Sequence, residues 1–365
     1  MYSMKNVKNV IKYIIQDNDV PMLLGGVGIG KSSIVRSIAS DLANGKKLVK
    51  KTNPSAKEFG FLDLRLSQYD VIDLGGLPYI KDGEQKRAML PNLPTEGEGV
   101  LFLDEFAQCP QSLQKVVGQL FDPIDEITGV RALGTYQLPQ GWKIVLGGNR
   151  ASDGSGANKL LVHCSNRVEL IEVEPTANDW IEWAMENDIH ADLIAYISNA
   201  PQALMDVDYK ALSSAQATPR SWERVSKRLH RIDSGGVPEA KDSGWLQNFL
   251  AITIGEEQAY ELTAFLKMKD DMPNLRDIVT GKDVPVVEQG GLCYLTSMAL
   301  VETIGSADKM EKETWFGNAL KYVESMATPE FSIFFVRSAV KKNPELAETE
   351  VFIKFKVDNQ NLEIN

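Results

Sequence analysis

The sequence predicts an α/β domain built on a parallel sheet, followed by a mainly helical region. Up to about residue 175, short apolar segments with strand character alternate with segments of helical periodicity, as in a parallel sheet covered on both faces. A glycine-rich loop stands between one such strand and one such helix. From Asn178 onward little strand character remains. We therefore expect the sheet in the first half of the chain and helices in the second.

Each expected element follows from local pattern. Apolar runs predict five strands, at Val20–Leu24, Phe61–Leu66, Val100–Leu103, Lys143–Leu146 and Val168–Val173. Apolar periodicity predicts helices over Ser32–Leu42, over much of Asn178–Leu229 and over Trp315–Met326, whose apolar residues are expected in a core. The Asp-Ser-Gly-Gly-Val-Pro segment at 233–238 predicts a linker. Three domains follow: an α/β domain of 1–175, a helical lid of 176–235 and a helical extension of 236–365.

Composition limits the class of protein. The 365 residues are 43% apolar, which is enough to form hydrophobic cores. The chain has 39 basic and 50 acidic residues, and its net charge of −11 argues against a general nucleic-acid-binding surface. Lys46, Lys47, Lys50 and Lys51 are expected in a solvated loop.

The cysteines and histidines predict no metal site and no disulfide. Cys109, Cys164 and Cys293 lack the spacing of either, and the adjacent His163 and Cys164 have no partner motif. No signal sequence or long apolar span is evident. We expect a reducing, cytoplasmic location and no membrane contact.

The glycine-rich loop carries the strongest chemical signal. The residues that follow the first strand are Gly25, Gly26, Val27, Gly28, Ile29, Gly30, Lys31, Ser32 and Ser33, and the first eight fit the pattern G-x-x-x-x-G-K-[ST]. Backbone N–H groups of such a loop and the N-terminus of the following helix cradle phosphate oxygens. Lys31 would reach the β- and γ-phosphates, and the Ser32 hydroxyl would ligate Mg²⁺. The sequence therefore predicts a nucleoside triphosphate site.

A second motif favours hydrolysis. The apolar strand Val100–Leu103 runs directly into Asp104 and Glu105. The carboxyl ends of parallel strands share one edge of the sheet, so these acids are expected beside the phosphates. Asp104 would hold Mg²⁺ and Glu105 would orient and deprotonate the attacking water.

With these motifs placed, the chain resembles AAA+ ATPases of the MoxR type, in the clade with an insertion in helix 2, over roughly residues 1–230. The segment Asp63–Pro78 looks like the second strand running into that insert. Leu138-Pro139 followed by Ile144–Asn149 is similar to the pre-sensor hairpin and sensor strand. Ala217-Thr218-Pro219-Arg220 resembles the second sensor motif, and Ser165-Asn166-Arg167-Val168 stands where the family has Asp-Arg-Phe.

The resemblance implies roles for three further residues. Asn149 would contact the γ-phosphate and the attacking water, which a neutral amide does without adding charge. Arg167 would act as a finger in the neighbouring subunit's site, with Arg150 as a competing trans or cis contact. Arg220 would reach the γ-phosphate from the lid, and Arg224, Lys227, Arg228 and Arg231 are expected on the solvated face of that helix.

The resemblance implies a homo-oligomeric ring, expected to be hexameric, that hydrolyses ATP to remodel or activate a protein partner, such as one with a von Willebrand factor A domain. A nucleic-acid motor or restriction-type translocase is the alternative, although the insert near Tyr69–Arg87 balances three bases against four acids. A nucleotide switch that barely hydrolyses is a third possibility. The sequence does not distinguish ATP from GTP or give the ring size or the client.

Overall fold

The computed structural model describes residues 4–88, 93–150, 153, 158, 160–208 and 215–359. They fall into two compact units: residues up to Pro175 form the first, and residues 176–208 and 215–359 belong to the second. Within the described residues, no helix combines the length and apolarity that a bilayer crossing requires.

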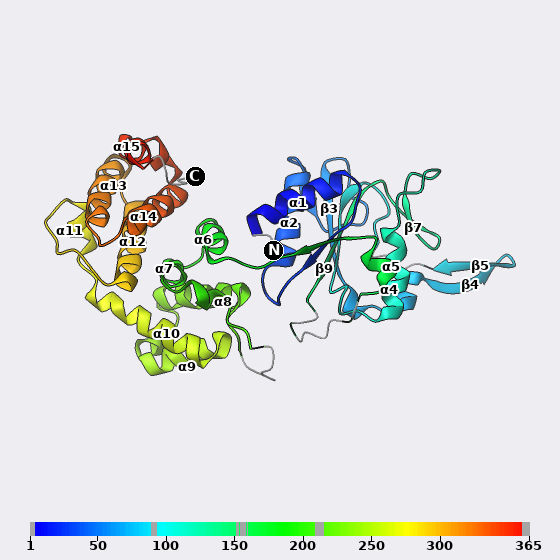
Figure 1. The fold of residues 1–365 in the computed structure, drawn as a ribbon, viewed down its shortest axis with the longest axis horizontal. Helices are drawn as coiled ribbons and strands as arrows, with labels where there is room; N and C mark the ends of the chain where they lie inside the picture. The colour runs from blue at the N-terminus through cyan, green and yellow to red at the C-terminus, as the bar shows by residue number, and fades with distance from the viewer. Residues whose placement is uncertain are drawn as a thin grey trace. The chain divides into compact units, whose positions relative to one another are not determined.

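The first unit is built on a six-stranded sheet (Figure 1). In spatial order its strands are β10 (Glu169–Glu172), β1 (Pro21–Leu24), β9 (Gly141–Gly148), β6 (Glu98–Asp104), β3 (Glu58–Arg65) and β2 (Lys47–Val49). Every neighbouring pair is parallel. The five predicted strands are all present, and the α/β prediction is confirmed. Because all the strands run one way, their carboxyl ends meet at a single edge.

Helices cover both faces of this sheet. The helix α2 (Lys31–Leu42) contacts β3, β6 and β9, while α1 (Met4–Gln16) packs on α2 and β1. On the other face, apolar side chains of α4 (Gln111–Val117) and the short α5 (Val162–Ser165) join Leu101 and Leu103 of β6 in one buried cluster. The strand β6 therefore faces a helix on each side, which explains its continuous apolar run.

Two hairpins and a one-turn helix extend from the first unit. The helix α3 (Val71–Gly75) is followed by the exposed hairpin of β4 (Leu77–Lys81) and β5 (Glu84–Ala88), in the segment predicted as the insert. The strands β7 (Arg131–Leu133) and β8 (Tyr136–Leu138) form the second hairpin. It ends at Leu138, within the segment that the sequence likened to a pre-sensor hairpin. The lysine-rich loop prediction was partly wrong, because Lys47 begins the edge strand β2.

The second unit is entirely helical apart from one isolated bridge, Asp206 with Ala217, among its described residues. Its described α-helices are α6 (Ala177–Glu186), α7 (Ala191–Asn199), α8 (Pro219–Asp233), α9 (Ser243–Ile254), α10 (Glu256–Lys267), α11 (Leu275–Val279), α12 (Gly290–Gly305), α13 (Lys309–Glu324), α14 (Pro329–Lys342) and α15 (Glu350–Asp358).

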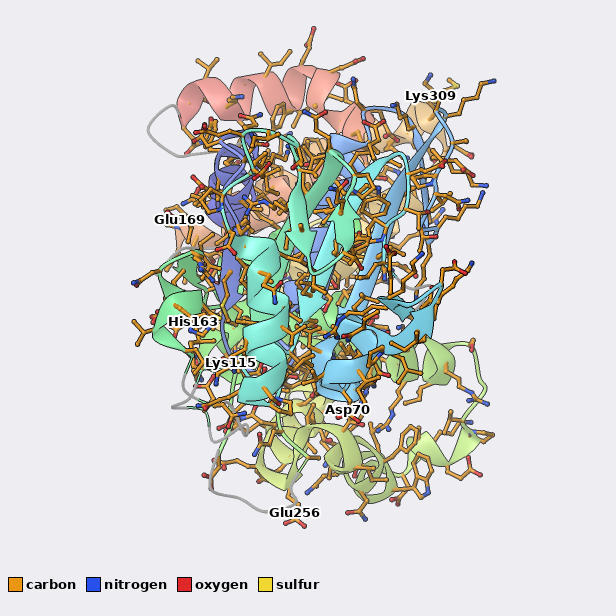
Figure 2. The ribbon with its side chains drawn as sticks, turned by 90° about the vertical axis from the view of Figure 1, so that its right-hand side faces the viewer. Asp70, Lys115, His163, Glu169, Glu256 and Lys309 are labelled. Atoms are coloured by element: carbon orange, nitrogen blue, oxygen red, sulfur yellow. The ribbon has the colours of Figure 1, made fainter. Side chains whose placement is uncertain are left out.

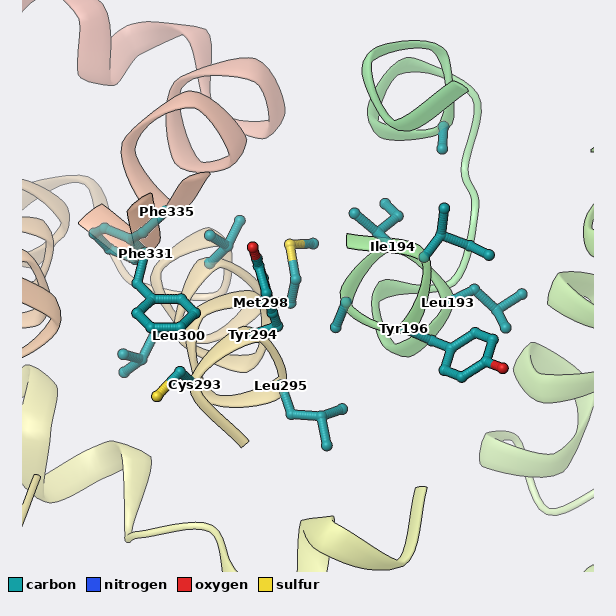
Figure 3. Packing of buried hydrophobic residues seen from close by; sticks show 14 of the residues in the cluster. Leu193, Ile194, Tyr196, Cys293, Tyr294, Leu295, Met298, Leu300, Phe331 and Phe335 are labelled. Atoms are coloured by element: carbon teal, nitrogen blue, oxygen red, sulfur yellow. The ribbon is translucent and has the colours of Figure 1, made fainter. Parts of the chain in front are cut away.

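The core of this unit surrounds α12. That helix is buried on nearly all sides, so it is apolar all round rather than amphipathic. Figure 3 shows Leu295 and Met298 of α12 between Leu193 and Ile194 of α7 and the phenylalanines of α14. One buried cluster runs from Trp180 to Phe355 and includes Trp315, Phe316, Leu320, Val323 and Met326, as predicted. The division of this unit into a lid of 176–235 and an extension of 236–365 stays a prediction.

Candidate active site

The glycine-rich loop joins β1 to α2 at the carboxyl edge of the sheet. Gly30 has a φ of 96° and precedes the first residue of α2, and none of the residues that the structure describes caps that helix with its side chain. The N–H groups of its first turn therefore lack a side-chain acceptor and present the positive end of the helix dipole, which suits a phosphate. A Cβ on Gly25 would lie 2.7 Å from the carbonyl oxygen of Val173, so only glycine fits at that position.

Lys31 is buried at 9% exposure and points back into this loop. Its ammonium group donates to the carbonyl oxygens of Gly25 and Gly26, each at 2.8 Å, and to the side-chain oxygen of Asn149 at 2.7 Å. Asn149 directly follows β9, the neighbour of β1. The contact between Lys31 and Asn149 thus joins two motifs 118 residues apart in sequence. A bound phosphate would replace the two carbonyl oxygens as acceptors for the Lys31 ammonium group.

Ser32 and Asp104 bring a second pair of motifs together. The Ser32 hydroxyl donates to Asp104 Oδ2 at 3.2 Å, and the backbone N–H of Glu105 donates to Asp104 Oδ1 at 2.9 Å. A hydroxyl and a carboxylate at this separation are the hard oxygen ligands that Mg²⁺ takes, with waters and substrate phosphates completing its coordination. Among the described residues, no group of three or more His, Cys, Asp and Glu could hold a metal ion, so such a site would depend on the phosphates.

Glu105 occupies an unusual backbone conformation. Its φ is 60°, in the left-handed region that costs a non-glycine residue free energy. Its carboxylate accepts a hydrogen bond from the Ser67 hydroxyl, in the turn Leu66–Gln68 that follows β3. The conformation turns the Glu105 side chain away from the course of β6 and toward the neighbouring strand end.

Three residues near these acids were not predicted from the sequence to belong to the site. Ser67 holds Glu105, and Gly147 leaves room for Asp104, since a Cβ there would lie 2.5 Å from Asp104 Oδ1. On β3, Asp63 has one buried carboxylate oxygen without a hydrogen-bond partner among the described residues. Burial, and then the charge of Asp104, raise the pKa of Asp63 above its ordinary value. For Ser67 and Asp63, the available signal in the sequence was a polar residue within or directly after an apolar strand.

The arginines lie in different places. Arg150 follows Asn149 at the same edge as the loop, where it pairs with Asp153 at 3.3 Å and Glu174 at 2.7 Å. Hydrogen bonds from Arg150 to Glu174 and Asp153 raise the pKa of its guanidinium, against the effect of partial burial. Both carboxylates belong to the first unit, as Arg150 does.

Arg167 precedes β10 and so lies at the opposite edge of the sheet, paired with Asp122 at 2.7 Å. Leu24, the last residue of β1, is level with Glu172 of β10. About 16 Å of strand therefore separates Arg167 from the edge that carries the loop.

Arg220 belongs to the second unit. It is exposed in the first turn of α8, where Thr218 caps the helix by accepting from the Ser221 N–H at 3.2 Å and Pro219 is the first helical residue. The helix start was predicted correctly, while the role of Arg220 stays a prediction. His163 is exposed (Figure 2), whereas the side chain of its neighbour Cys164 is buried.

Comparison with known proteins gives a likeness of fold only. No protein family matches the sequence, and no curated protein matches it. Among solved structures, NtrX from Brucella abortus in complex with ADP is similar over 98% of this chain and 68% of its own, with 13% identity and a TM-score of 0.39. The RuvB Holliday junction branch migration motor of Thermotoga maritima is similar over 83% of this chain and 81% of its own, with 14% identity and a TM-score of 0.32. At these scores neither likeness carries an argument about function, which rests on the site itself.

Proposed function

We propose that this chain is an ATPase of the AAA+ class, of MoxR type, that hydrolyses ATP with Mg²⁺ in a homo-oligomeric ring. The observation that carries the proposal is the convergence of Lys31, Asn149, Ser32 and Asp104 at one sheet edge, through contacts of 2.7 Å and 3.2 Å. These residues come from three different strand ends. Their types match what a triphosphate with a magnesium ion requires.

The proposed chemistry follows from the positions. The loop from Gly25 to Ser33 binds the phosphates, and Lys31 exchanges its carbonyl acceptors for β- and γ-phosphate oxygens. Ser32 and Asp104 would hold Mg²⁺, which when bound neutralises charge on the phosphate oxygens. Glu105 accepts a proton from a water that attacks the γ-phosphorus, the bond to the bridging oxygen breaks, and ADP leaves. Asn149 orients the water and the γ-phosphate with its amide NH₂ group.

A ring is proposed because of where Arg167 lies. An arginine that stabilises the transferred phosphoryl group raises the rate by several orders of magnitude. At the far edge of its own sheet, Arg167 is too distant from its own loop to do so, whereas a head-to-tail neighbour brings it to the next site. Arg220 is proposed to reach the same phosphate from the second unit of the subunit that binds the nucleotide. The ring is proposed to be a hexamer in the cytoplasm.

A protein client is favoured by the exposed hairpin β4–β5. Three of its apolar residues, Leu77, Tyr79 and Ile80, are exposed. Of its cations, Arg87 donates to the carbonyl oxygens of Gly75 and Gly76, and Lys86 lies 3.8 Å from Glu84. Such a surface suits a polypeptide better than a phosphate backbone. The client is proposed to be a protein that the ring remodels, such as one with a von Willebrand factor A domain.

Mixing two inactive variants tests the shared site. Glu105→Gln removes the base and Arg167→Ala removes the trans residue, so each alone is expected to be inactive. In an equal mixture about a quarter of the sites combine an intact Glu105 with an intact neighbouring Arg167, and ATPase activity returns accordingly. Glu105→Gln mixed with Lys31→Ala is the matched control, because both changes affect the same subunit's half of the site and no mixture restores it. Full activity of Arg167→Ala alone would contradict the proposal.

A further inference from the structure

The helix α8 is a local reversal of the charge of the chain. It carries five basic residues against two acidic ones, a net charge of 5 − 2 = +3 in a protein of net charge −11. Arg220, Arg224, Arg228 and Arg231 follow one another at spacings of four, four and three, and therefore share one face. Among the described residues, none of these four arginines forms an ion pair, whereas Lys227 pairs with Glu223 at 2.6 Å.

An apolar stripe on α9 runs beside this row. Trp245, Phe249 and Ile252 lie at helical spacing on that helix, with Trp245 37% and Ile252 71% exposed. The Trp245 and Phe249 rings are 4.9 Å apart. The Arg228 guanidinium lies 4.4 Å from the centre of the Phe249 ring and donates to its carbonyl oxygen. Arg228 thus fixes the stripe to the arginine row, and Arg224 is one turn away.

A loop of opposite charge lies in the first unit. Residues 122–128 contain Asp122, Asp125 and Glu126 and no basic residue. The Asp125 carboxylate accepts from the N–H of Ile127 at 3.1 Å and from the N–H of Thr128 at 2.7 Å, which fixes the turn. Ile127 is 95% exposed at its tip, and Glu126 is exposed beside it. The loop presents an exposed apolar side chain next to carboxylates, in a turn held by two hydrogen bonds to Asp125.

The two surfaces meet if the proposed function is correct, on which this step rests. Asp122, the first residue of the loop, is bound to Arg167 at 2.7 Å, so the loop accompanies Arg167 to the neighbouring subunit. In that neighbouring subunit, Arg220 is proposed to reach the γ-phosphate that Arg167 contacts from outside. Arg220 is also the first member of the arginine row on α8. The next member, Arg224, lies about one helical turn, or 6 Å, further along α8.

We infer that the loop 122–128 of one copy docks on the α8–α9 surface of the next copy, with Asp125 and Glu126 against the arginine row and Ile127 against Ile252 and Trp245. The occupant is a second copy of this chain. The pairing is heterologous, so it joins copies head to tail, as the proposed ring requires, and does not close a two-fold dimer. This docking couples ring assembly to the placement of Arg167, because the loop 122–128 both contacts the next copy and binds Arg167 through Asp122.

A charge exchange tests this pairing. Glu126→Arg and Arg224→Glu change exposed residues, and neither Glu126 nor Arg224 forms an ion pair or a side-chain hydrogen bond within the described part of the chain. Each alone is expected to move the self-association midpoint, followed by sedimentation velocity with Mg²⁺ and ATP, to about tenfold higher protein concentration. The double variant Glu126→Arg/Arg224→Glu is expected to return it close to that of the unmodified protein. Lys321→Glu, on α13, is the control for a charge reversal elsewhere, and thermal unfolding confirms that every variant is folded.

The outcomes separate this inference from the proposed function. If the single variants assemble like the Lys321→Glu control, or the double variant is no better than either single one, the docking is wrong although the ring remains. If the unmodified protein hydrolyses ATP at a rate per subunit independent of concentration and stays monomeric throughout, both the ring and the docking fail. Rescue of assembly by the double variant supports the pairing, as does a self-association midpoint that no longer depends on salt concentration in the single variants.

Discussion

Adding one methyl group at Gly147 is expected to damage the site more than its size suggests. A Cβ there would lie 2.5 Å from Asp104 Oδ1 and 2.8 Å from Cζ of the fully buried Phe102. Ordinary contacts are about 3.5–4.0 Å, so the Asp104 carboxylate must move by about 1 Å. Its hydrogen bond with the Glu105 N–H, now 2.9 Å, would be strained or lost.

The magnitude follows from these two effects. Overpacking in a closed core costs about 1–3 kcal/mol, and the hydrogen bond adds about 1 kcal/mol, so Gly147→Ala is expected to lower the free energy of unfolding by about 2–4 kcal/mol. A displacement of 1 Å in a catalytic group lowers the rate by about 10²-fold. Nucleotide affinity measured without Mg²⁺ is expected to change little, because the glycine-rich loop is untouched.

Gly148→Ala is the matched control. The nearest atoms to its Cβ are those of Ala107 and the flexible Met22 side chain at 3.0 Å, so its cost is expected to stay below about 1 kcal/mol. Urea unfolding gives the free energy, and ATPase and nucleotide-binding titrations give the rate and affinity. Equal stability and equal ATPase rate for the two variants would refute the packing argument.

Three further predictions concern single groups. Ser67→Ala is expected to lower kcat about tenfold with the same nucleotide Kd, since only the orientation of Glu105 is lost, and Ser67→Thr is expected to restore it; an altered Kd with normal kcat would contradict this. Asp63→Asn is expected to stabilise the protein at neutral pH. The folded-state pKa of Asp63 is raised, so stability falls as pH rises through its ordinary value of 3.8, and the gain should disappear below that value; an equal gain at all pH values would contradict it. All three cysteines are buried, and burial raises the pKa of Cys109 to about 12, so a thiol reagent is expected to label none in the folded protein and three in denaturant.

The sequence predicted most of the sheet because its strands are buried on both faces. Continuous apolar runs such as Val100–Leu103 cannot be confused with solvated loops. The glycine-rich loop pattern also indicates the strand before it and the helix after it. The edge strand β2 was missed because it is only three residues long, is paired on one side only and begins with the exposed Lys47 in a lysine-rich segment, which resembles a loop. The exposed hairpin β4–β5 likewise has no buried face to give a pattern.

The site was predictable only where a motif is local in sequence. Lys31, Ser32, Asp104 and Glu105 are found by spacing, and the structure shows Ser32 beside Asp104 and Lys31 beside Asn149. Ser67 was not found, because its contact with Glu105 depends on β3 lying next to β6, a register that no local pattern encodes.

Mg²⁺-dependent ATP hydrolysis and ATP binding, compared for the unmodified chain, Lys31→Ala and Glu105→Gln, decide whether the site at the carboxyl edge of the sheet is an ATPase site. We expect the unmodified chain to bind and hydrolyse ATP, Lys31→Ala to lose binding, and Glu105→Gln to bind normally while its hydrolysis falls by about 10²–10⁴-fold. Hydrolysis that persists in Lys31→Ala, or a Glu105→Gln rate equal to that of the unmodified chain, would contradict the assignment of this site.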